Sequence, residues 1–360
     1  DHTRIILEDN ESSSPGFSDY INANLIKPIF QVLPEYEMFA GISRSYISTQ
    51  GCLPNTVDDF WRMIWQKKCS IIVMTTKEME RGKVVLASLY PNTRLFVRCD
   101  SVINHLGFVS LKSKCARYWS CVGQQKVCGL NKELTIVTVS EETCPDYTLR
   151  TLSVKRNVES KATEERTIYQ YQFLAWPDHG VPSDPSSVLN FLEEVDRRAA
   201  TIKDCGPVVV HCSAGIGRTG AFIAIDLILN SIKRNGLQCI IDIRRTVEML
   251  RSQRSGMVQT EAQYKFVYLA VQHYIDILAK HLQEQKRSEV LQREYTNIRY
   301  TSENANFNLS PTSTTLKGND SQCNSFSEEV VASNAAALEK LHLQPPPRPK
   351  RLLKQATGTQ

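Results

Sequence analysis

Residues 207–220 constrain the fold of this 360-residue chain more than any other segment. A run of valines ends at His211 and Cys212, a five-residue loop with two glycines follows, and Arg218 stands just before an apolar stretch. This order predicts a buried strand, a tight loop and a helix that opens at the arginine. In such a turn, successive backbone N–H groups and the positive end of the helix point at one place. The sequence therefore predicts an anion-binding loop that starts with a thiol. The residues between the cysteine and the arginine are Ser213, Ala214, Gly215, Ile216 and Gly217.

The chemistry expected of this loop follows from its charges. A positive field favours the thiolate of Cys212 over the thiol, and the thiolate is the form that attacks phosphorus. Arg218 adds a planar fork that can hold two phosphate oxygens at once. We therefore interpret the anion site and the nucleophile as one unit.

Residues 211–220, His-Cys-Ser-Ala-Gly-Ile-Gly-Arg-Thr-Gly, resemble the Cys-(x)5-Arg signature of the protein tyrosine phosphatases. A buried structural cysteine is the alternative, but a chance match to ten residues is rare. Residues 176–180 resemble the mobile acid loop of that family, and residues 259–263 its glutamine loop. Taken alone, the first would be a turn signal and the second an ordinary helix start capped by Thr260. Residues 19–24 and 46–51 match two scaffold motifs of the same fold.

The resemblance implies a two-step hydrolysis of phosphotyrosine. Cys212 attacks phosphorus, Arg218 and the loop amides hold the equatorial oxygens, and Asp178 gives a proton to the leaving tyrosine. Asp178 then takes a proton from the water that releases phosphate. Gln259 would position that water, and Gln263 would assist.

The resemblance also assigns supporting roles. Thr219 would donate a hydrogen bond to the departing thiolate, and His211 would lie beneath it as an orienting residue. Glu80 would brace Arg218, and Lys114 would contact the acid loop. These four assignments come from the family and not from spacing.

The implied fold is α/β, a single phosphatase domain over residues 1–283 with a central twisted mixed sheet flanked by helices. The chain fits this class, because β-branched runs at 70–75, 134–139 and 207–211 alternate with helical periodicity. We expect helices to begin after Thr56 and at Pro185, and a long helix to cover residues 260–282. Residues 284–360 are polar and poor in aromatics, which predicts a disordered signalling tail.

Four runs are most similar to the cytosolic subgroup that carries Src-homology-two domains, the corkscrew-like phosphatases. They are residues 61–63, 73–78, 251–259 and 294–298. This implies a non-receptor enzyme that acts on phosphotyrosine proteins in receptor tyrosine kinase signalling in the cytoplasm. We expect the chain to hold the catalytic domain and C-terminal tail only. In that subgroup two recognition domains would precede residue 1, and they are absent from this sequence.

Two departures from the family bear on activity. A Lys-Asn-Arg-Tyr segment, whose tyrosine stacks on the substrate ring, would lie before residue 1. Residues 84–112 are an atypical insert, which is similar to an alternative or unspliced exon or forms a surface hairpin. Because the insert falls between Glu80 and Lys114, we expect it to loosen their loop and its deletion to raise activity and stability. The alternative function is a catalytically impaired splice form or fragment that binds phosphotyrosine or adaptors.

Composition excludes several function classes. A net charge of +5 is too small to indicate nucleic-acid binding, and the longest apolar stretch, residues 220–229, is too short to span a membrane. Eleven cysteines without paired short spacings are unlike a disulfide framework or a zinc cluster, which favours a reducing cytoplasm. We expect no metal, no cofactor and no transmembrane segment.

Two tail motifs predict adaptor partners. Tyr295, followed by Thr296 and Asn297, resembles the phosphorylated ligand of adaptor Src-homology-two domains; an unmodified surface tyrosine is the alternative. The run from Pro346 to Arg351 fits the PxxPx(R/K) pattern of Src-homology-three ligands. A basic linker or a nuclear localisation patch fits this run almost as well.

Overall fold

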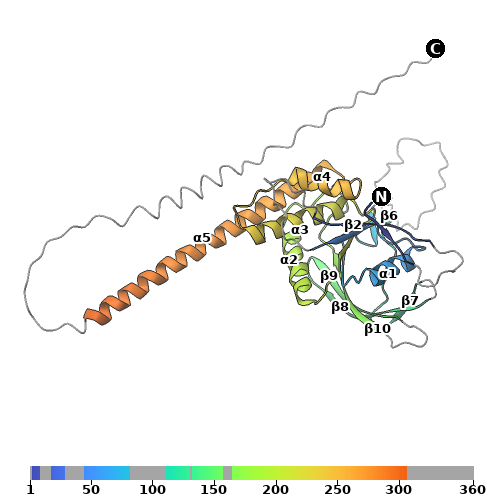
Figure 1. Cartoon of the computed structure of the whole chain (residues 1–360), viewed down its shortest axis with the longest axis horizontal. Coiled ribbons are helices and arrows are strands. Elements are labelled where there is room, and N and C mark those ends of the chain that lie inside the picture. The colour runs from blue at the N-terminus through green and yellow to red at the C-terminus, as the bar shows by residue number, and fades with distance from the viewer. Residues whose placement is uncertain are drawn as a thin grey trace, which may run out of the picture. The chain divides into compact units, whose positions relative to one another are not determined.

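A mixed sheet of nine strands is the frame of residues 1–287, which group into one structural unit (Figure 1). The structure, a computed structural model, describes residues 2–8, 18–28, 44–81, 111–129, 132–156 and 164–305. The strand order is β1-β2-β3-β11-β4-β10-β9-β8-β7. The strands are β1 (Arg4–Ile6), β2 (Tyr20–Ile26), β3 (Tyr46–Thr49), β4 (Ile71–Met74), β7 (Gln125–Cys128), β8 (Leu134–Thr143), β9 (Tyr147–Arg156), β10 (Glu164–Phe173) and β11 (Val208–His211).

The centre of the sheet is parallel and its flanks are antiparallel. β11 pairs in parallel with β3 and β4, and β4 pairs in parallel with β10. Every residue of β3, β4 and β11 is buried, as expected for parallel strands covered on both faces. The predicted runs at 70–75 and 207–211 correspond to β4 and β11, and the run at 134–139 is the first part of β8. The predicted α/β class is confirmed.

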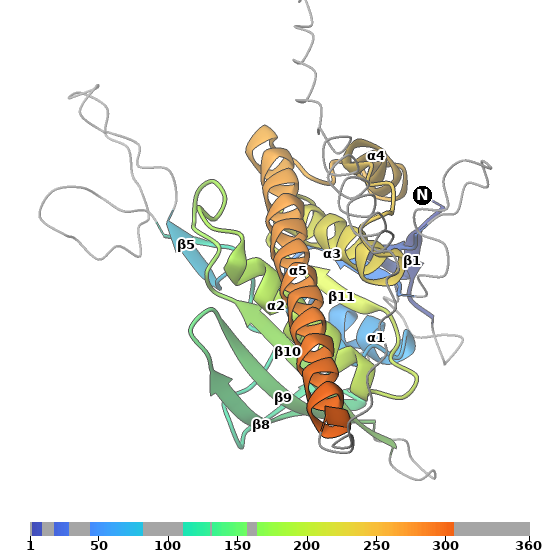
Figure 2. The same ribbon diagram turned by 90° about the vertical axis from the view of Figure 1, so that its left-hand side faces the viewer.

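Helices cover both faces of the sheet. α1 (Val57–Gln66) packs on one face. The other face is covered by α2 (Ser186–Thr201), α3 (Gly217–Asn235), α4 (Ile243–Gln253) and the first turns of α5 (Glu261–Ala305). Figure 2 shows the molecule from this second side. The strands supply both cores by alternation: Ile71 and Val73 join the α2 to α5 side, whereas Ile72 and Met74 join the α1 side. Among the described helices, none has the length and apolarity needed to cross a bilayer.

The C-terminal helix is longer than the sequence predicted. α5 begins at Glu261, as expected, but continues to Ala305, so residues 284–305 of the predicted disordered tail are helical. Residues 283–293 are mostly Gln, Glu, Lys and Arg, which favour helix, and neither Gly nor Pro occurs between residue 283 and Pro311. The prediction failed because a helix that is polar all round gives no apolar stripe. The proline-rich run at 346–351 lies outside the described residues.

A two-stranded sheet lies beside the main one. β5 (Met79–Arg81) pairs antiparallel with β6 (Leu111–Ser113), and Glu80 stands opposite Lys112. The last two residues of the predicted insert, Leu111 and Lys112, are therefore part of a paired strand. Residues 84–110 of the insert lie outside the described residues.

Candidate active site

Cys212 follows β11 directly, at the edge where the parallel strands β3, β11 and β4 end together. α3 begins at Gly217, so the chain makes the strand, loop and helix that the sequence predicts. The segments that follow β3 and β4 meet the Cys212 loop, defined here as residues 212–218, at this edge. The carboxyl ends of parallel strands are where ligand sites of α/β folds usually form.

The Cys212 loop turns its carbonyl groups outward. The Ser48 hydroxyl donates to the Gly215 carbonyl at 2.9 Å, and the Gly51 N–H donates to the Ser213 carbonyl at 2.9 Å. Because these carbonyls are engaged outside, the loop N–H groups can face its centre. The Gly215 N–H lies 3.2 Å from Cys212 Sγ. Backbone donors directed at one point suit an anion.

Arg254, just after α4, is an outer support of the loop that the sequence analysis did not single out. Its guanidinium donates to the carbonyls of Ala214 at 3.2 Å and Gly215 at 3.0 Å. It also donates to Asn22 at 2.8 Å and Asn24 at 2.6 Å in β2. Burial lowers the pKa of Arg254 from its usual value, and the nearby Cys212 opposes that change. Its only sequence signal was its place in residues 251–259, a run typical of the subgroup.

Gly215 is required by the close approach of the loop to β3. Its φ is +69°, and a Cβ atom there would lie 2.0 Å from the carbonyl oxygen of Thr49. Any side chain would therefore push the loop away from β3 and misdirect its amides.

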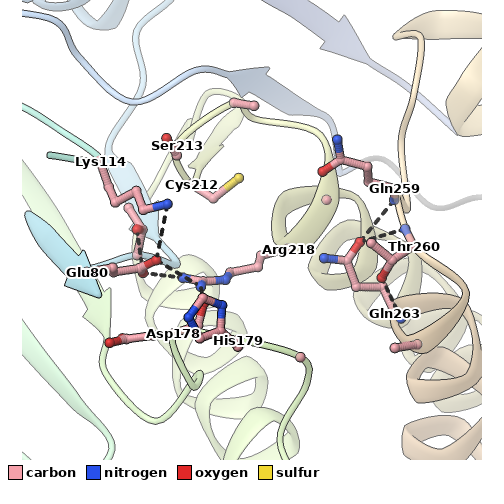
Figure 3. Close-up of a pocket in the computed structure, with 15 residues that line it drawn as sticks. Glu80, Lys114, Asp178, His179, Cys212, Ser213, Arg218, Gln259, Thr260 and Gln263 are labelled. Carbon is pink, nitrogen blue, oxygen red and sulfur yellow. Dashed lines mark hydrogen bonds and ion pairs between the residues drawn. The ribbon is translucent and has the colours of Figure 1, made fainter. Parts of the chain in front are cut away.

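Arg218 connects three segments of the site (Figure 3). Nη1 and Nη2 donate to the two carboxylate oxygens of Glu80 at 2.5 and 3.1 Å, a bidentate pair. The guanidinium also donates to the backbone carbonyls of Thr75 at 3.1 Å, Pro177 at 3.1 Å and Asp178 at 3.3 Å. The loop after β4, the acid loop and the Cys212 loop are thus held by one side chain.

Glu80 is firmly held, contrary to the loosening that we expected from the insert. Its side chain is 3% exposed, and it accepts from Thr76 Oγ1 at 2.8 Å while Lys114 Nζ lies 3.9 Å away. Burial raises the pKa of Glu80, but hydrogen bonds from Arg218 and Thr76 outweigh this and hold the pKa below its usual range. The physical reason is the β5–β6 pairing, which brings the two ends of the insert together.

Residues 176–180 carry Asp178 into the pocket from the segment between β10 and α2. The Trp176 ring packs against Phe266 of α5, with centroids 5.4 Å apart, and its indole N–H donates to the Gly180 carbonyl at 3.1 Å. The Asp178 side chain is 20% exposed, and its Oδ1 lies 3.5 Å from Nζ of Lys77. We had not singled out Lys77, and Lys114 instead contacts Glu80.

The glutamine loop is fixed by a capping box at the start of α5. The Thr260 hydroxyl accepts from the Gln263 N–H at 3.2 Å, and Gln263 Oε1 accepts from the N–H groups of Gln259 and Thr260 at 3.0 and 3.2 Å. A Cβ on Gly217 would lie 2.9 Å from Gln263 Nε2 and 3.3 Å from Gln259 Oε1. Both amides therefore border the Cys212 loop, and Thr260 is the helix cap that the sequence suggested.

His211 and Thr219 are fully buried behind the loop. His211 Nε2 lies 2.9 Å from the Tyr118 hydroxyl, and Nδ1 lies 3.2 Å from the carbonyl oxygen of Cys212. Burial lowers the pKa of His211 to about 4, so the imidazole is neutral near neutral pH. Thr219 Oγ1 has no hydrogen-bond partner within the part of the chain that the structure describes.

A pocket of about 410 Å³ brings most of the predicted residues together (Figure 3). Within the described ranges, no group of three or more His, Cys, Asp or Glu side chains could hold a metal ion. The pocket can therefore present a thiol, a guanidinium, a carboxyl group and two amides to one ligand. The predicted residues that line it are Glu80, Lys114, Asp178, Cys212, Ser213, Ala214, Gly217, Arg218, Gln259 and Gln263.

Comparison with known families matches this architecture to one of them. The family model described as protein-tyrosine phosphatase matches residues 1–106 and 97–273. The chain belongs to the protein tyrosine phosphatase family. The two matched stretches overlap at residues 97–106, which lie within residues 84–112.

Several phosphatases are similar to this chain. Tyrosine-protein phosphatase corkscrew of Drosophila virilis is 49% identical over 267 residues, which are 73% of this chain and 30% of the relative. Corkscrew of Drosophila melanogaster is 48% identical over 278 residues, 75% of this chain and 28% of the relative. Tyrosine-protein phosphatase non-receptor type ptp-2 of Caenorhabditis elegans is 38% identical over 316 residues, 76% of this chain and 42% of the relative. The chain thus spans less than half the length of these curated relatives.

The pairing of β5 with β6 changes the prediction for the insert of this phosphatase domain. Deleting residues 84–112 leaves Lys83 to take the place of Lys112 opposite Glu80, with Arg81 and Gly82 as the turn. Because Glu80 already braces Arg218, we expect kcat/KM to change less than about threefold, and Tm to rise slightly as the loop shortens. The measurement is kcat/KM on an aryl phosphate together with a melting curve. Glu80→Gln, made with and without the insert, is the matched control and should lower activity equally in both. A gain of tenfold or more on deletion would mean that the insert does loosen the site.

Proposed function

We propose that this chain hydrolyses phosphotyrosine through a cysteinyl-phosphate intermediate. The observation that carries the proposal is the convergence of Cys212, Arg218, Asp178 and Gln259 on one pocket, with a loop N–H directed at the sulfur. Each group has a distinct task in phosphoryl transfer, and they come from three separate segments of the chain. Stabilisation of the fold alone gives no reason for these four side chains to converge on one pocket.

In the first step the Cys212 thiolate attacks phosphorus. The S–P bond forms while the bond between phosphorus and the tyrosine oxygen breaks, and Asp178 gives its proton to that oxygen. Arg218 and the loop N–H groups bind the three equatorial oxygens, where charge gathers in the transition state. Because Arg218 also donates to the backbone of Asp178, phosphate binding and placement of the acid are coupled.

In the second step water attacks the cysteinyl phosphate. Gln259 and Gln263 lie against the loop at Gly217 and can orient that water, while Asp178, now ionised, takes its proton. The S–P bond breaks and inorganic phosphate leaves. The buried Thr219 hydroxyl, which has no hydrogen-bond partner among the described residues, can donate to the thiolate as it re-forms.

The biological setting is part of the proposal. The similarity to corkscrew and ptp-2 supports a non-receptor phosphatase of the Src-homology-two-domain-containing subgroup, which acts on phosphotyrosine proteins in receptor tyrosine kinase signalling in the cytoplasm. Adaptor proteins are the partners proposed for Tyr295 and for the run at 346–351. Tyr295 lies in the helical backbone of α5, so an extended adaptor-bound form would require that turn to unwind.

Turnover of a small aryl phosphate by the purified chain tests the chemistry directly, and its pH profile tests the mechanism. We expect kcat/KM to be bell-shaped with a maximum below neutrality. The acid limb reflects protonation of the substrate phosphate at about pH 6, and the basic limb reflects loss of the Asp178 proton.

Two buried groups do not contribute to these limbs. The pKa of His211 is about 4 and the pKa of Glu80 lies below its usual range, so over the working range the first stays neutral and the second ionised. Because the folded state lowers the pKa of Glu80, its pairing with Arg218 stabilises the protein above that pKa and is lost only as pH falls through it. A rate that climbs steadily through pH 8 would contradict the site assignment.

A further inference from the structure

A buried polar network lies behind the pocket of this phosphatase, and Arg150 of β9 is its centre. Arg150 is 7% exposed; its guanidinium stacks on the Trp119 ring at 4.5 Å and donates to Glu141 of β8 at 2.5 Å. Nη1 also donates to Gln170 Oε1 at 3.0 Å and to Gln172 Oε1 at 2.9 Å. A guanidinium this deep in a core destabilises the fold unless such bonds satisfy it.

Sheet register explains why these side chains meet. Arg150 stands directly opposite Gln170 in the β9–β10 pair, and Gln172 lies two residues along on the same face. β10 also pairs with β4, whose C-terminal end leads into the segment that carries Thr75, Thr76 and Glu80. A single cation on β9 can thus reach two separate parts of the catalytic site.

One branch of the network runs from Arg150 to the nucleophile. Because Gln170 Oε1 accepts from Arg150, its Nε2 faces Tyr118 and donates to the hydroxyl oxygen at 3.2 Å. The Tyr118 proton is then directed to His211 Nε2, 2.9 Å away. Burial raises the pKa of Tyr118 and lowers that of His211 to about 4, so the phenol keeps its proton and the imidazole is neutral.

The direction of these hydrogen bonds fixes the tautomer of His211. With Nε2 accepting, the proton sits on Nδ1 and is shared with the carbonyl oxygen of Cys212 at 3.2 Å. The other tautomer would oppose two lone pairs at that contact. Among the acceptors that the described residues offer, it would also leave the Tyr118 proton only the Met74 sulfur, 3.9 Å away and a weak acceptor. The hydrogen bonds that run from Arg150 through Gln170 and Tyr118 to His211 therefore hold the peptide group between Cys212 and Ser213. In this orientation its carbonyl is turned away from the anion site.

The second branch runs from Arg150 to the phosphate-binding arginine. Gln172 Nε2 donates to the carbonyl of Thr76 at 3.3 Å, and the Thr76 hydroxyl donates to Glu80 Oε1 at 2.8 Å. Glu80 in turn holds Arg218 in the bidentate pair. Displacement of Gln172 would let the Thr76 backbone shift and change the angle at which Glu80 presents Arg218.

We propose that Arg150 is a positioning residue of the phosphatase site, which orients the nucleophile through Gln170 and the phosphate-binding arginine through Gln172. The inference rests on the proposed function of the pocket. Its distinctive consequence is that the two branches can be cut separately. A residue that merely stabilised the sheet would affect the reactivity of Cys212 and the affinity for phosphate together, or would affect neither.

The experiment measures the two properties in the full chain without using turnover. The pH profile of iodoacetamide alkylation at Cys212, followed by mass spectrometry of its peptide, reports the state of the nucleophile. Protection of Cys212 from alkylation by inorganic phosphate reports phosphate affinity. We expect Gln170→Leu to move the alkylation profile up by about half a pH unit or more and leave the phosphate Kd within about twofold. We expect Gln172→Leu to weaken phosphate binding about threefold to tenfold and leave the alkylation profile in place.

Arg150→Met keeps the stem that covers Trp119 and should produce both changes at once. Ile168→Val, a buried apolar change on β10, is the matched control and should lower Tm without moving either property. A folded Arg150→Met that moves neither property would overturn the proposal, as would the same pattern of change in Gln170→Leu and Gln172→Leu. If Arg150→Met does not fold, the two glutamine variants decide the matter. Aryl phosphate turnover by the wild-type chain is measured in parallel, so that failure of the proposed function is recognised separately.

Discussion

Cys212→Ser is expected to abolish hydrolysis of aryl phosphates and phosphotyrosine peptides while phosphotyrosine binding persists. Serine keeps the shape of the loop, so the outward carbonyl bonds from Ser48, Gly51 and Arg254 remain and the inward N–H groups still bind phosphate. A neutral hydroxyl without a general base is too weak a nucleophile to replace a thiolate. The loss in kcat should exceed about 10⁴-fold.

Calorimetric titration with a phosphotyrosine peptide, beside a turnover assay, separates the two effects. Cys239→Ser is the matched control: Cys239 is half-buried in the segment between α3 and α4 and should be replaceable without loss of kcat. Residual hydrolysis by Cys212→Ser above the level of buffer would rule out a cysteinyl-phosphate intermediate. Loss of binding together with turnover would show that the sulfur, rather than the loop, holds the ligand.

The parts of the site that the sequence predicted are contiguous in the chain. β11, the Cys212 loop and the start of α3 follow one another over 14 residues, residues 207–220, and their order alone specifies a strand, a turn and a helix. The acid loop and the glutamine loop were identified by their resemblance to short motifs of the phosphatase family, because each taken alone is only a turn signal or a helix start. Local patterns of this kind can be recognised without knowledge of how the strands pair.

The supports that the sequence did not predict depend on pairing. Arg254 reaches the Cys212 loop from beyond α4, and Arg150 reaches Gln170 only because β9 and β10 have one particular register. In a linear sequence these are an arginine near a helix end and an arginine in an alternating strand. Nothing local distinguishes either from a surface cation.

The insert illustrates a related limit of sequence reasoning. We inferred looseness at Glu80 because residues 84–112 fall between it and Lys114. Loop-closure entropy grows only slowly with length, however, and an antiparallel stalk of three residue pairs holds the two ends together. An insertion between two residues therefore does not by itself show how firmly a carboxylate is held.

Asp178→Asn should lower kcat by about 10²- to 10³-fold and change KM far less. The leaving oxygen needs a proton only in the transition state, so removal of the acid affects that state and not the bound substrate. Asparagine preserves the size of the side chain, and the bonds from Arg218 to the carbonyls of Pro177 and Asp178 involve only the backbone, so the acid loop should keep its position. Asp184→Asn, at an exposed carboxylate just before α2, is the matched control and should leave kcat nearly unchanged.

Two further readouts identify Asp178 as the proton donor and not as a mere support of the loop. The loss should be larger for aryl phosphates with poor leaving groups, because a strongly basic phenolate depends on protonation while a weakly basic one leaves unaided. The basic limb of the kcat/KM profile should also flatten, since the variant has no proton to lose as pH rises. An equal loss for good and poor leaving groups, or an unchanged basic limb, would assign proton transfer to another group in the pocket. His179 and Lys114 would then be the next side chains to replace, because both line the same cavity.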